Sequence, residues 1–206
     1  MDPVWLKWAK ELAAIAQNGL TYAETDYDTE RYQAVRRIAA EMMSARSNQD
    51  TETLIKILAD EEGYATPKVD VRGVVFRESK ILLVEEKIDG GWTLPGGWAD
   101  PCQSPSECVI REIREESGYE TEARKLLALY DRSKHPHKPP FPFHIYKMFF
   151  LCEITGGVPK VSHETTGVDF FPEDQIPDLS ISRVLPAQIA RMFEHHRNPD
   201  MPVDFD

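Results

Sequence analysis

Cysteine and long apolar runs are scarce in this sequence. Its 206 residues include three cysteines, Cys102, Cys108 and Cys152, which show neither a zinc-ligand spacing nor the even number typical of a disulfide framework. No run of about 18 apolar residues is present, which argues against a membrane-spanning helix. The partly apolar start is interrupted by charged residues, unlike a secretory signal. We therefore expect a reduced, cytoplasmic setting.

Positive charge is also in deficit. Lysine and arginine number 24 against 35 aspartates and glutamates, which gives a formal net charge of −11. Such a surface repels polyanions at long range, so a general nucleic-acid binder is disfavoured. A small phosphate-bearing ligand could still bind to so acidic a protein if metal ions offset the negative charge at the binding site. The length suits one domain, or one domain with a small extra module.

The first third of the chain has the pattern of helices only. Apolar residues recur at steps of three and four over residues 5–15, and Gly19 is expected to end this first helix. Asp28 and Asp50 are expected to cap a second and a third helix. Because so short a helical trio buries little core of its own, it should pack on the rest of the chain or on a second copy. A homodimer is the prediction.

The pattern changes after Thr66-Pro67. We predict a helical module over residues 1–66 and an α/β (α+β) domain over 67–206, because strands and helices alternate with antiparallel pairs. Gly156-Gly157 is expected to form a turn. The expected strands are 69–76, 81–85, 92–94, 126–131, 144–154 and 168–171, and the expected helices are 105–117 and about 183–197.

The helix at 105–117 has well-defined ends. Ser104 and Glu107 have the spacing of a capping box, and Pro105 suits the first turn. Gly118 follows as the expected C-terminal cap.

Three acids cluster on this helix: Glu112, Glu115 and Glu116. Like charges at these spacings cost about 0.2–0.5 kcal/mol per pair, and the helix dipole adds about 0.3–1 kcal/mol for each acid near the C-terminus. A bound hard cation such as Mg²⁺ or Mn²⁺ would reverse both penalties. Spacing alone leaves a solvated acidic face equally open.

The segment 97–119 resembles the Nudix box. That signature is a glycine, five residues, a glutamate, seven residues, and then Arg-Glu-aliphatic-x-Glu-Glu-x-Gly-hydrophobic. Gln103 departs from it by replacing the first glutamate. The matching residues are Gly97, Arg111, Glu112, Ile113, Glu115, Glu116, Gly118 and Tyr119.

The resemblance extends over nearly the whole chain. The stretches Val-Asp-Val-Arg-Gly-Val-Val-Phe, Leu-Pro-Gly-Gly-Trp-Ala-Asp, Lys-His-Pro-His and Glu-Ile-Thr-Gly-Gly, with the helical start, are similar to one bacterial Nudix subgroup. That subgroup includes CDP-choline pyrophosphatase and is often labelled ADP-ribose pyrophosphatase. It implies a Nudix α/β/α sandwich with a mixed sheet, and cleavage of the pyrophosphate of a nucleoside diphosphate linked to a small group.

The resemblance also implies the site. Glu112, Glu115 and Glu116 would hold Mg²⁺ or Mn²⁺ with the backbone carbonyl of Gly97, and Arg111 would orient the glutamates.

A general base often lies outside the box in this family. Glu164, in Ser-His-Glu-Thr-Thr, is our candidate, with Asp100 and Glu153 as weaker rivals.

Four residues are candidates for substrate contacts: Arg72, Trp98, Arg132 and His135. Arg72 interrupts a valine-rich strand, and Arg132 and His135 belong to a basic loop that suits phosphates. Trp98, with the aromatic 141–143 loop, suits a choline head group. Each residue also has an ordinary structural role open to it.

Three functions compete. The first is a pyrophosphohydrolase, with CDP-choline favoured over ADP-ribose as its substrate. The second acts on RNA ends, which the net charge of −11 opposes. The third is a non-catalytic metabolite sensor, which the retained acids disfavour.

Overall fold

The computed structural model describes residues 2–206, which form two compact units. One unit contains the chain up to Pro67 together with Pro140–His144, and the other contains Lys68–Pro139 and Ile145–Asp206. No helix among the described residues is both long and apolar enough to cross a membrane.

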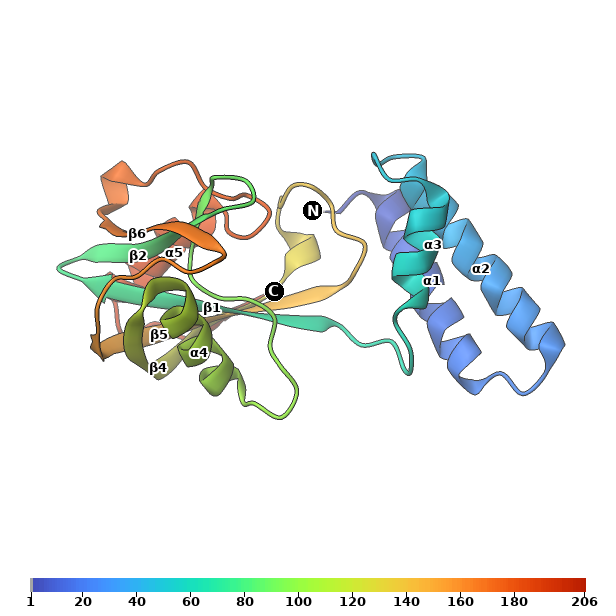
Figure 1. Ribbon diagram of the computed structural model, residues 1–206, viewed down its shortest axis with the longest axis horizontal. Coiled ribbons are helices and arrows are strands. Elements are labelled where there is room, and N and C mark those ends of the chain that lie inside the picture. The colour runs from blue at the N-terminus through green and yellow to red at the C-terminus, as the bar shows by residue number, and fades with distance from the viewer. Residues whose placement is uncertain (1) are drawn as a thin grey trace. The chain divides into compact units, whose positions relative to one another are not determined.

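The first unit is built from three helices that lie side by side (Figure 1): α1 Val4–Tyr22, α2 Asp26–Ser44 and α3 Thr51–Ala59. Small and aliphatic residues fill the space between them, and Phe143 packs against the same cluster. The buried members are Leu6, Ala9, Ala39, Ala40, Met43, Leu54 and Leu58.

Two expectations about these helices were wrong. Gly19 does not end α1, which continues to Tyr22. A Cβ at Gly19 would come within 2.3 Å of the Tyr32 ring, so this glycine permits α2 to approach closely. The cap of α2 is Thr25, which accepts from the Asp28 N–H, because the helix starts earlier than predicted.

The Asp50 cap of α3 is confirmed, since its side chain accepts from the Thr53 N–H.

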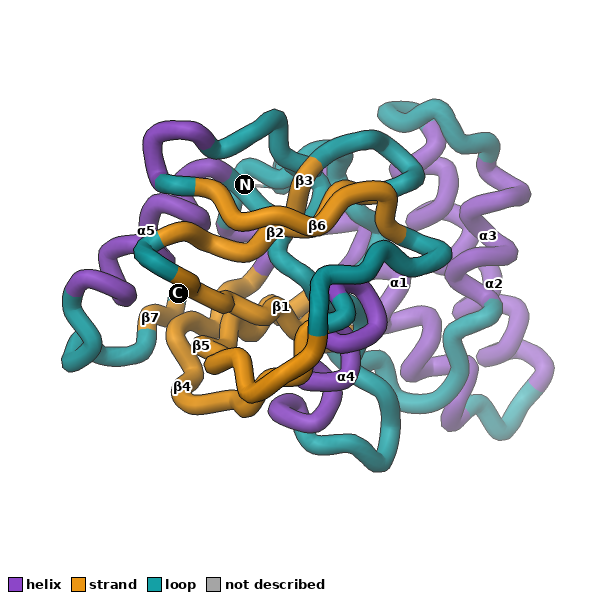
Figure 2. The backbone as a smooth tube through the Cα atoms, turned by 60° about the vertical axis from the view of Figure 1, so that its left-hand side comes forward, coloured by secondary structure: helices purple, strands orange, loops and turns teal. Residues whose placement is uncertain are grey.

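The second unit contains a seven-stranded mixed sheet (Figure 2). The strand order is β3-β2-β1-β5-β4-β7, with β6 paired to β2. The pairs β1–β5 and β4–β7 are parallel, and the others are antiparallel. The strands are β1 Lys68–Arg77, β2 Lys80–Glu86, β3 Trp92–Thr93, β4 Tyr119–Asp131, β5 Ile145–Gly157, β6 Thr165–Phe171 and β7 Asp204–Phe205.

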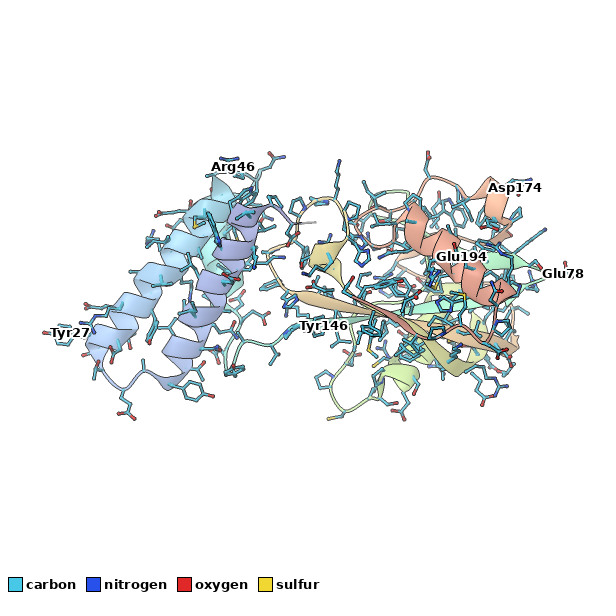
Figure 3. All side chains as sticks on the ribbon, turned by 180° about the vertical axis from the view of Figure 1, so that it is seen from behind. Tyr27, Arg46, Glu78, Tyr146, Asp174 and Glu194 are labelled. Carbon is cyan, nitrogen blue, oxygen red and sulfur yellow. The ribbon has the colours of Figure 1, made fainter. Side chains whose placement is uncertain are left out.

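The predicted strands at 69–76 and 81–85 are present as β1 and β2. Glu78 lies at the tip of the turn between them (Figure 3), where Glu78 and Ser79 both have positive φ. That conformation suits a tight turn between twisted antiparallel strands.

The predicted turn at Gly156-Gly157 was wrong. Both glycines lie inside β5, where Gly157 pairs with Tyr119 and Gly156 with Glu120. The start of β4 was also missed, since β4 begins at Tyr119 rather than at 126. Buried and exposed residues alternate from Tyr119 to Glu122, opposite the two glycines, so cross-strand pairing outweighs their turn propensity.

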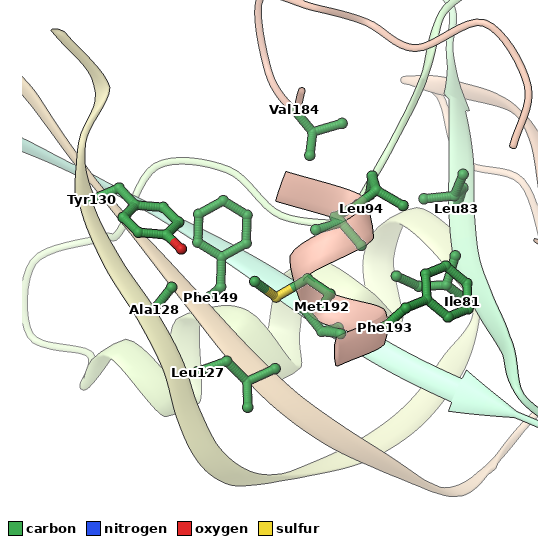
Figure 4. Close-up of a cluster of buried hydrophobic side chains, with 12 residues drawn as sticks. Ile81, Leu83, Leu94, Leu127, Ala128, Tyr130, Phe149, Val184, Met192 and Phe193 are labelled. Atoms are coloured by element: carbon green, nitrogen blue, oxygen red, sulfur yellow. The ribbon is translucent and has the colours of Figure 1, made fainter. Parts of the chain in front are cut away.

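Two helices cover opposite faces of the sheet. Helix α4, Pro105–Ser117, packs through Val109 and Ile113 onto a cluster that includes Val71 of β1. Helix α5, Pro186–Arg197, packs on the other face through a cluster that includes Met192 and Phe193 (Figure 4). This confirms the α/β/α sandwich. Two short 3₁₀ helices, η1 Arg132–Lys134 and η2 Glu173–Gln175, lie in loops.

Both ends of α4 form as predicted. Ser104 and Glu107 make the capping box, and Gly118 closes the helix at φ 77° in the left-handed region. The position of every acid on α4 is therefore fixed from both ends.

Candidate active site

A glycine-containing loop follows β3 and runs along β1. The Gly73 N–H donates to the Pro95 carbonyl at 2.8 Å, and the Val71 N–H donates to the Gly97 carbonyl at 2.8 Å. Gly96 has φ 143°, and a Cβ there would lie 2.0 Å from the Val71 oxygen. Only glycine allows the loop to lie this close to the strand.

Two acids of α4 face this loop. Glu116 is buried, and its Oε2 accepts from the Gly96 N–H at 2.8 Å. The Glu112 side chain is nearly buried, and a Cβ at Gly97 would lie 3.1 Å from its Oε2. The structure therefore brings together Gly97, Glu112 and Glu116, three of the four ligands that the Nudix resemblance implies.

Arg111 forms ion pairs and a hydrogen bond with the surrounding side-chain acceptors. Its Nη1 lies 2.9 Å from Glu112 and 3.0 Å from Glu115, and its Nη2 lies 2.7 Å from Asp100. Its Nε donates to Gln103 Oε1 at 3.1 Å. Gln103, the one departure from the box, thus still presents an oxygen to the arginine.

The buried acids are poorly solvated. Burial raises the pKa of Glu116 to about 8, and the Arg72 charge offsets only part of this effect. Burial also raises the pKa of Glu112. A hard cation would supply the missing countercharge, and the Gly97 carbonyl has a second lone pair for it. The residues present therefore fit a divalent metal ion.

Glu115 is turned toward solvent and Arg111. Among residues 2–206, no three acidic, histidine or cysteine side chains converge as a formed cation cage. The assignment of Glu115 as a third ligand stays a prediction, and it requires this side chain to rotate inward from Arg111.

Glu164 lies close to the end of α4. Its backbone carbonyl accepts from the Lys87 N–H at 2.9 Å, and the next residue, Thr165, donates through Oγ1 to the Glu116 carbonyl at 3.0 Å. Its exposed carboxylate pairs with His163.

The two rival bases are held by arginines: Asp100 by Arg111, and Glu153 by Arg124 on β4. Both carboxylates already accept charge-assisted hydrogen bonds from arginine, and the assignment of Glu164 as the general base stays a prediction.

The candidate substrate residues are placed differently from one another. Arg72 is buried and makes two hydrogen bonds to Asp70. Arg132 is buried and donates to the carbonyls of Pro139 and Ser182, and His135 lies 3.1 Å from Asp206. These three side chains have structural partners.

Trp98, 46% exposed, directly follows Gly97. It is the most accessible of the four candidates for substrate contact.

Sequence reasoning missed three buried charges: Asp70 on β1, Lys147 on β5 and Glu86 on β2. The Glu86 carboxylate pairs with Arg183 Nε at 2.7 Å. One signal was available for Asp70 and Lys147, because each interrupts an apolar strand at a position where a solvated charge is not expected.

Comparison with known proteins agrees with this geometry. A family model described as the NUDIX domain matches residues 66–191, more than half of the chain, so the chain belongs to the Nudix family. It is a Nudix pyrophosphohydrolase, a class of enzyme that generally uses a divalent metal ion. A second model, described as a UDP-X-like N-terminal oligomerisation domain, matches residues 3–58.

Two individual relatives cover nearly the whole chain, and a third covers about two thirds of it. A Bacillus subtilis (strain 168) protein, provisionally named ADP-ribose pyrophosphatase YjhB, is 48% identical over 98% of this chain and 97% of its own length. A crystal structure described as a UDP-X diphosphatase is 30% identical, has a TM-score of 0.64 and covers 98% of both chains. An ADP-ribose pyrophosphatase structure from Streptococcus suis is 35% identical, with a TM-score of 0.60, over 68% of this chain and 100% of that one.

Proposed function

We propose that this enzyme uses Mg²⁺ or Mn²⁺ to hydrolyse the pyrophosphate bond of a nucleoside diphosphate linked to a small group. The observation that carries the proposal is the buried Glu116 carboxylate, held on the Gly96 N–H beside Glu112 and the Gly97 carbonyl. Glu112, Glu116 and the Gly97 carbonyl are the proposed ligands, with Glu115 joining them after rotation.

The residues around the acids have distinct tasks in this proposal. The metal, when bound, supplies charge neutralisation of the diphosphate and activation of the attacking water. Arg111 orients Glu112 and Glu115 through charge-assisted hydrogen bonds. The exposed Glu164 carboxylate, next to the end of α4, accepts the proton of the attacking water.

ADP-ribose is the first substrate candidate, because two of the relatives above carry that activity in their names. CDP-choline is the second, because the exposed Trp98 beside Gly97 offers an aromatic face for a quaternary ammonium group. The 141–143 loop, expected from sequence to contribute to a choline cage, belongs to the first unit, where Phe143 packs on the helical cluster.

The test measures initial rates with Mg²⁺ and with Mn²⁺ on ADP-ribose, CDP-choline and UDP-sugars. Glu116→Gln should lower kcat/KM by at least about 100-fold, because metal-assisted charge stabilisation contributes several kcal/mol and each 1.4 kcal/mol is tenfold. The matched control is Glu120→Gln, an exposed acid just beyond the same helix. Full activity of Glu116→Gln, or hydrolysis that is unaffected by a chelator, would contradict the proposal.

A further inference from the structure

Three charged side chains are buried together beneath the glycine loop. Asp70 and Arg72 are neighbours on one face of β1, and Lys147 stands opposite Asp70 in the parallel β1–β5 register. Their exposed fractions are 6%, 4% and 2%. Lys147 Nζ lies 2.6 Å from Asp70 Oδ1, while Arg72 donates to the same carboxylate through Nε at 2.9 Å and Nη2 at 2.7 Å. The carboxylate therefore joins two cations from two strands.

Stability alone is a poor explanation for this cluster. Burying charges is costly, and well-packed apolar residues of similar volume are often at least as stable as a buried ion triad. The triad also carries a formal charge of +1, which Asp70 alone does not cancel. Burial lowers the pKa of Arg72, but Asp70, and at longer range Glu116 and Glu86, raise it above its ordinary value overall. The positive charge of the cluster is therefore attracted to the buried acids of the active site.

The triad is connected to the glycine loop at both ends of that loop. Arg72 Nη1 donates to the Leu94 carbonyl at 3.1 Å, immediately before Pro95-Gly96-Gly97. Beyond the glycines, Trp98 forms an antiparallel bridge with the backbone of Asp70. Between these anchors the Gly96 N–H is held by Glu116. The loop is thus held by the triad on one side and by α4 on the other.

We propose that Lys147 and Asp70 are positioning residues that act through Arg72. Lys147 fixes the Asp70 carboxylate, Asp70 fixes the plane of the Arg72 guanidinium, and Arg72 fixes Leu94 and with it the Gly97 carbonyl opposite Glu112. A lysine on β5, a strand outside the Nudix box, thereby sets the geometry of the cation site. This inference rests on the proposed function of that site.

The test is a titration of the whole chain with Mn²⁺, in which electron paramagnetic resonance measures the concentration of the free ion. Lys147→Met removes the charge but keeps the length of the side chain, and Asp70→Asn removes the acceptor charge shared by both cations. Each should raise the Mn²⁺ Kd by about 10–100-fold, as loss of a partner behind the ligands does in other metal sites. The conservative Lys147→Arg should keep Kd within a few-fold of wild type. At saturating Mn²⁺, the kcat of Lys147→Met should be reduced from the wild-type value by a smaller factor than its Mn²⁺ affinity is.

A matched control separates positioning from simple destabilisation. Lys125 on β4 also has a partly buried amine, which donates to the Pro199 and Met201 carbonyls, and β5 separates its strand from β1 in the sheet. Lys125→Met should lower the Tm and leave the Mn²⁺ Kd unchanged. A Lys147→Met protein with a lower Tm and a wild-type Kd would overturn the inference.

Two further variants keep the result decisive. If Lys147→Met does not fold, Arg72→Lys carries the test, because lysine keeps the charge but lacks the fork that bonds Asp70 and Leu94 together. It should raise the Kd in the same range, and a wild-type Kd would refute the inference. Glu116→Gln distinguishes the two proposals. If this variant binds Mn²⁺ like wild type, both proposals fail. If it loses Mn²⁺ binding while Lys147→Met and Arg72→Lys bind normally, only the positioning role is rejected.

Discussion

Glu116 is the residue at which function and stability conflict. Its folded pKa is raised to about 8 because it is buried, whereas in an unfolded chain it titrates near the ordinary 4.5. Below pH 4.5 both states hold the proton. As the pH rises through 8, the folded metal-free protein must lose its proton inside the site, and the stability that the raised pKa gave at low pH is lost.

We expect Glu116→Gln to be more stable than wild type without metal at pH 8, by about 1–3 kcal/mol, since each pKa unit corresponds to about 1.4 kcal/mol. Glutamine keeps an oxygen for the Gly96 N–H and removes the buried charge. Urea unfolding with a chelator measures the gain. Mn²⁺ should then raise the Tm of wild type and not that of the variant. Equal stabilisation of both by Mn²⁺ would remove Glu116 from the ligand set.

His137 makes a second prediction at this scale. Burial, with the charges of Lys147 and Arg132, lowers its pKa to about 3. Between pH 6.5 and 3 the unfolded chain therefore binds a proton that the folded protein excludes. As the pH is lowered through this range, the free energy of unfolding falls by up to about 1.4 kcal/mol per pH unit. His137→Gln should flatten this acid limb in urea titrations, while the exposed His163→Gln should not. An unchanged slope in His137→Gln would contradict the assignment.

At the scale of elements, helix α4 was predictable from sequence because its signals are local. The cap at Ser104, the acids one turn apart and Gly118 all lie within one short segment, and the structure reproduces each of them. The interior glycine of α1 and the glycine pair of β5 were misjudged, because the Tyr32 ring and the β4 strand that decide them lie elsewhere in the chain.

The part of the site that faces α4 could not be predicted for the same reason. The bonds from Arg72 to Leu94 and from Lys147 to Asp70 join residues 22 and 77 positions apart. The first depends on how the loop after β3 lies along β1, and the second on the parallel register of β1 and β5, neither of which a local pattern encodes. Sequence could identify Arg72 as unusual, but not that its partners are a carboxylate and a carbonyl rather than a substrate.

Substitution of Gly118 tests whether the C-terminal cap of α4 positions the acids of its last turn. It has φ 77°, and a Cβ there would lie 2.4 Å from the Val158 oxygen, whereas Gly90 has φ 67° and a Cβ there would meet no atom within 4 Å. Gly90→Ala should cost about 1–2 kcal/mol for the left-handed backbone alone. Gly118→Ala should cost more and also lower activity, because the last turn carries Glu115 and Glu116. Equal losses of stability with full activity in both variants would mean that this cap does not position the acids.

At the scale of the whole molecule, the helical unit presents an unusual surface. Val4, Trp8, Ile15 and Tyr22 of α1 are all more than half exposed, and their spacing of four and seven residues places them along one face of the helix. Tyr27 at the start of α2 is also exposed and projects outward (Figure 3). Exposed apolar side chains along one face of a helix, here with the acid Glu11 among them, are typical of an interface between protein chains. The match of residues 3–58 to an oligomerisation domain agrees with this interpretation.

We expect this stripe to form the homodimer contact, with Trp8 near its energetic centre, since large aromatic residues dominate such interfaces. Trp8→Glu in the full-length protein should weaken the dimer by at least about tenfold in Kd, equivalent to about 1.4 kcal/mol, because a charge would be buried without a partner. Sedimentation velocity across a concentration series measures the change. Lys56→Glu, which changes an exposed residue of α3 outside this stripe, is the control and should sediment as wild type. A monomeric wild type, or an undisturbed dimer in Trp8→Glu, would move the interface away from α1.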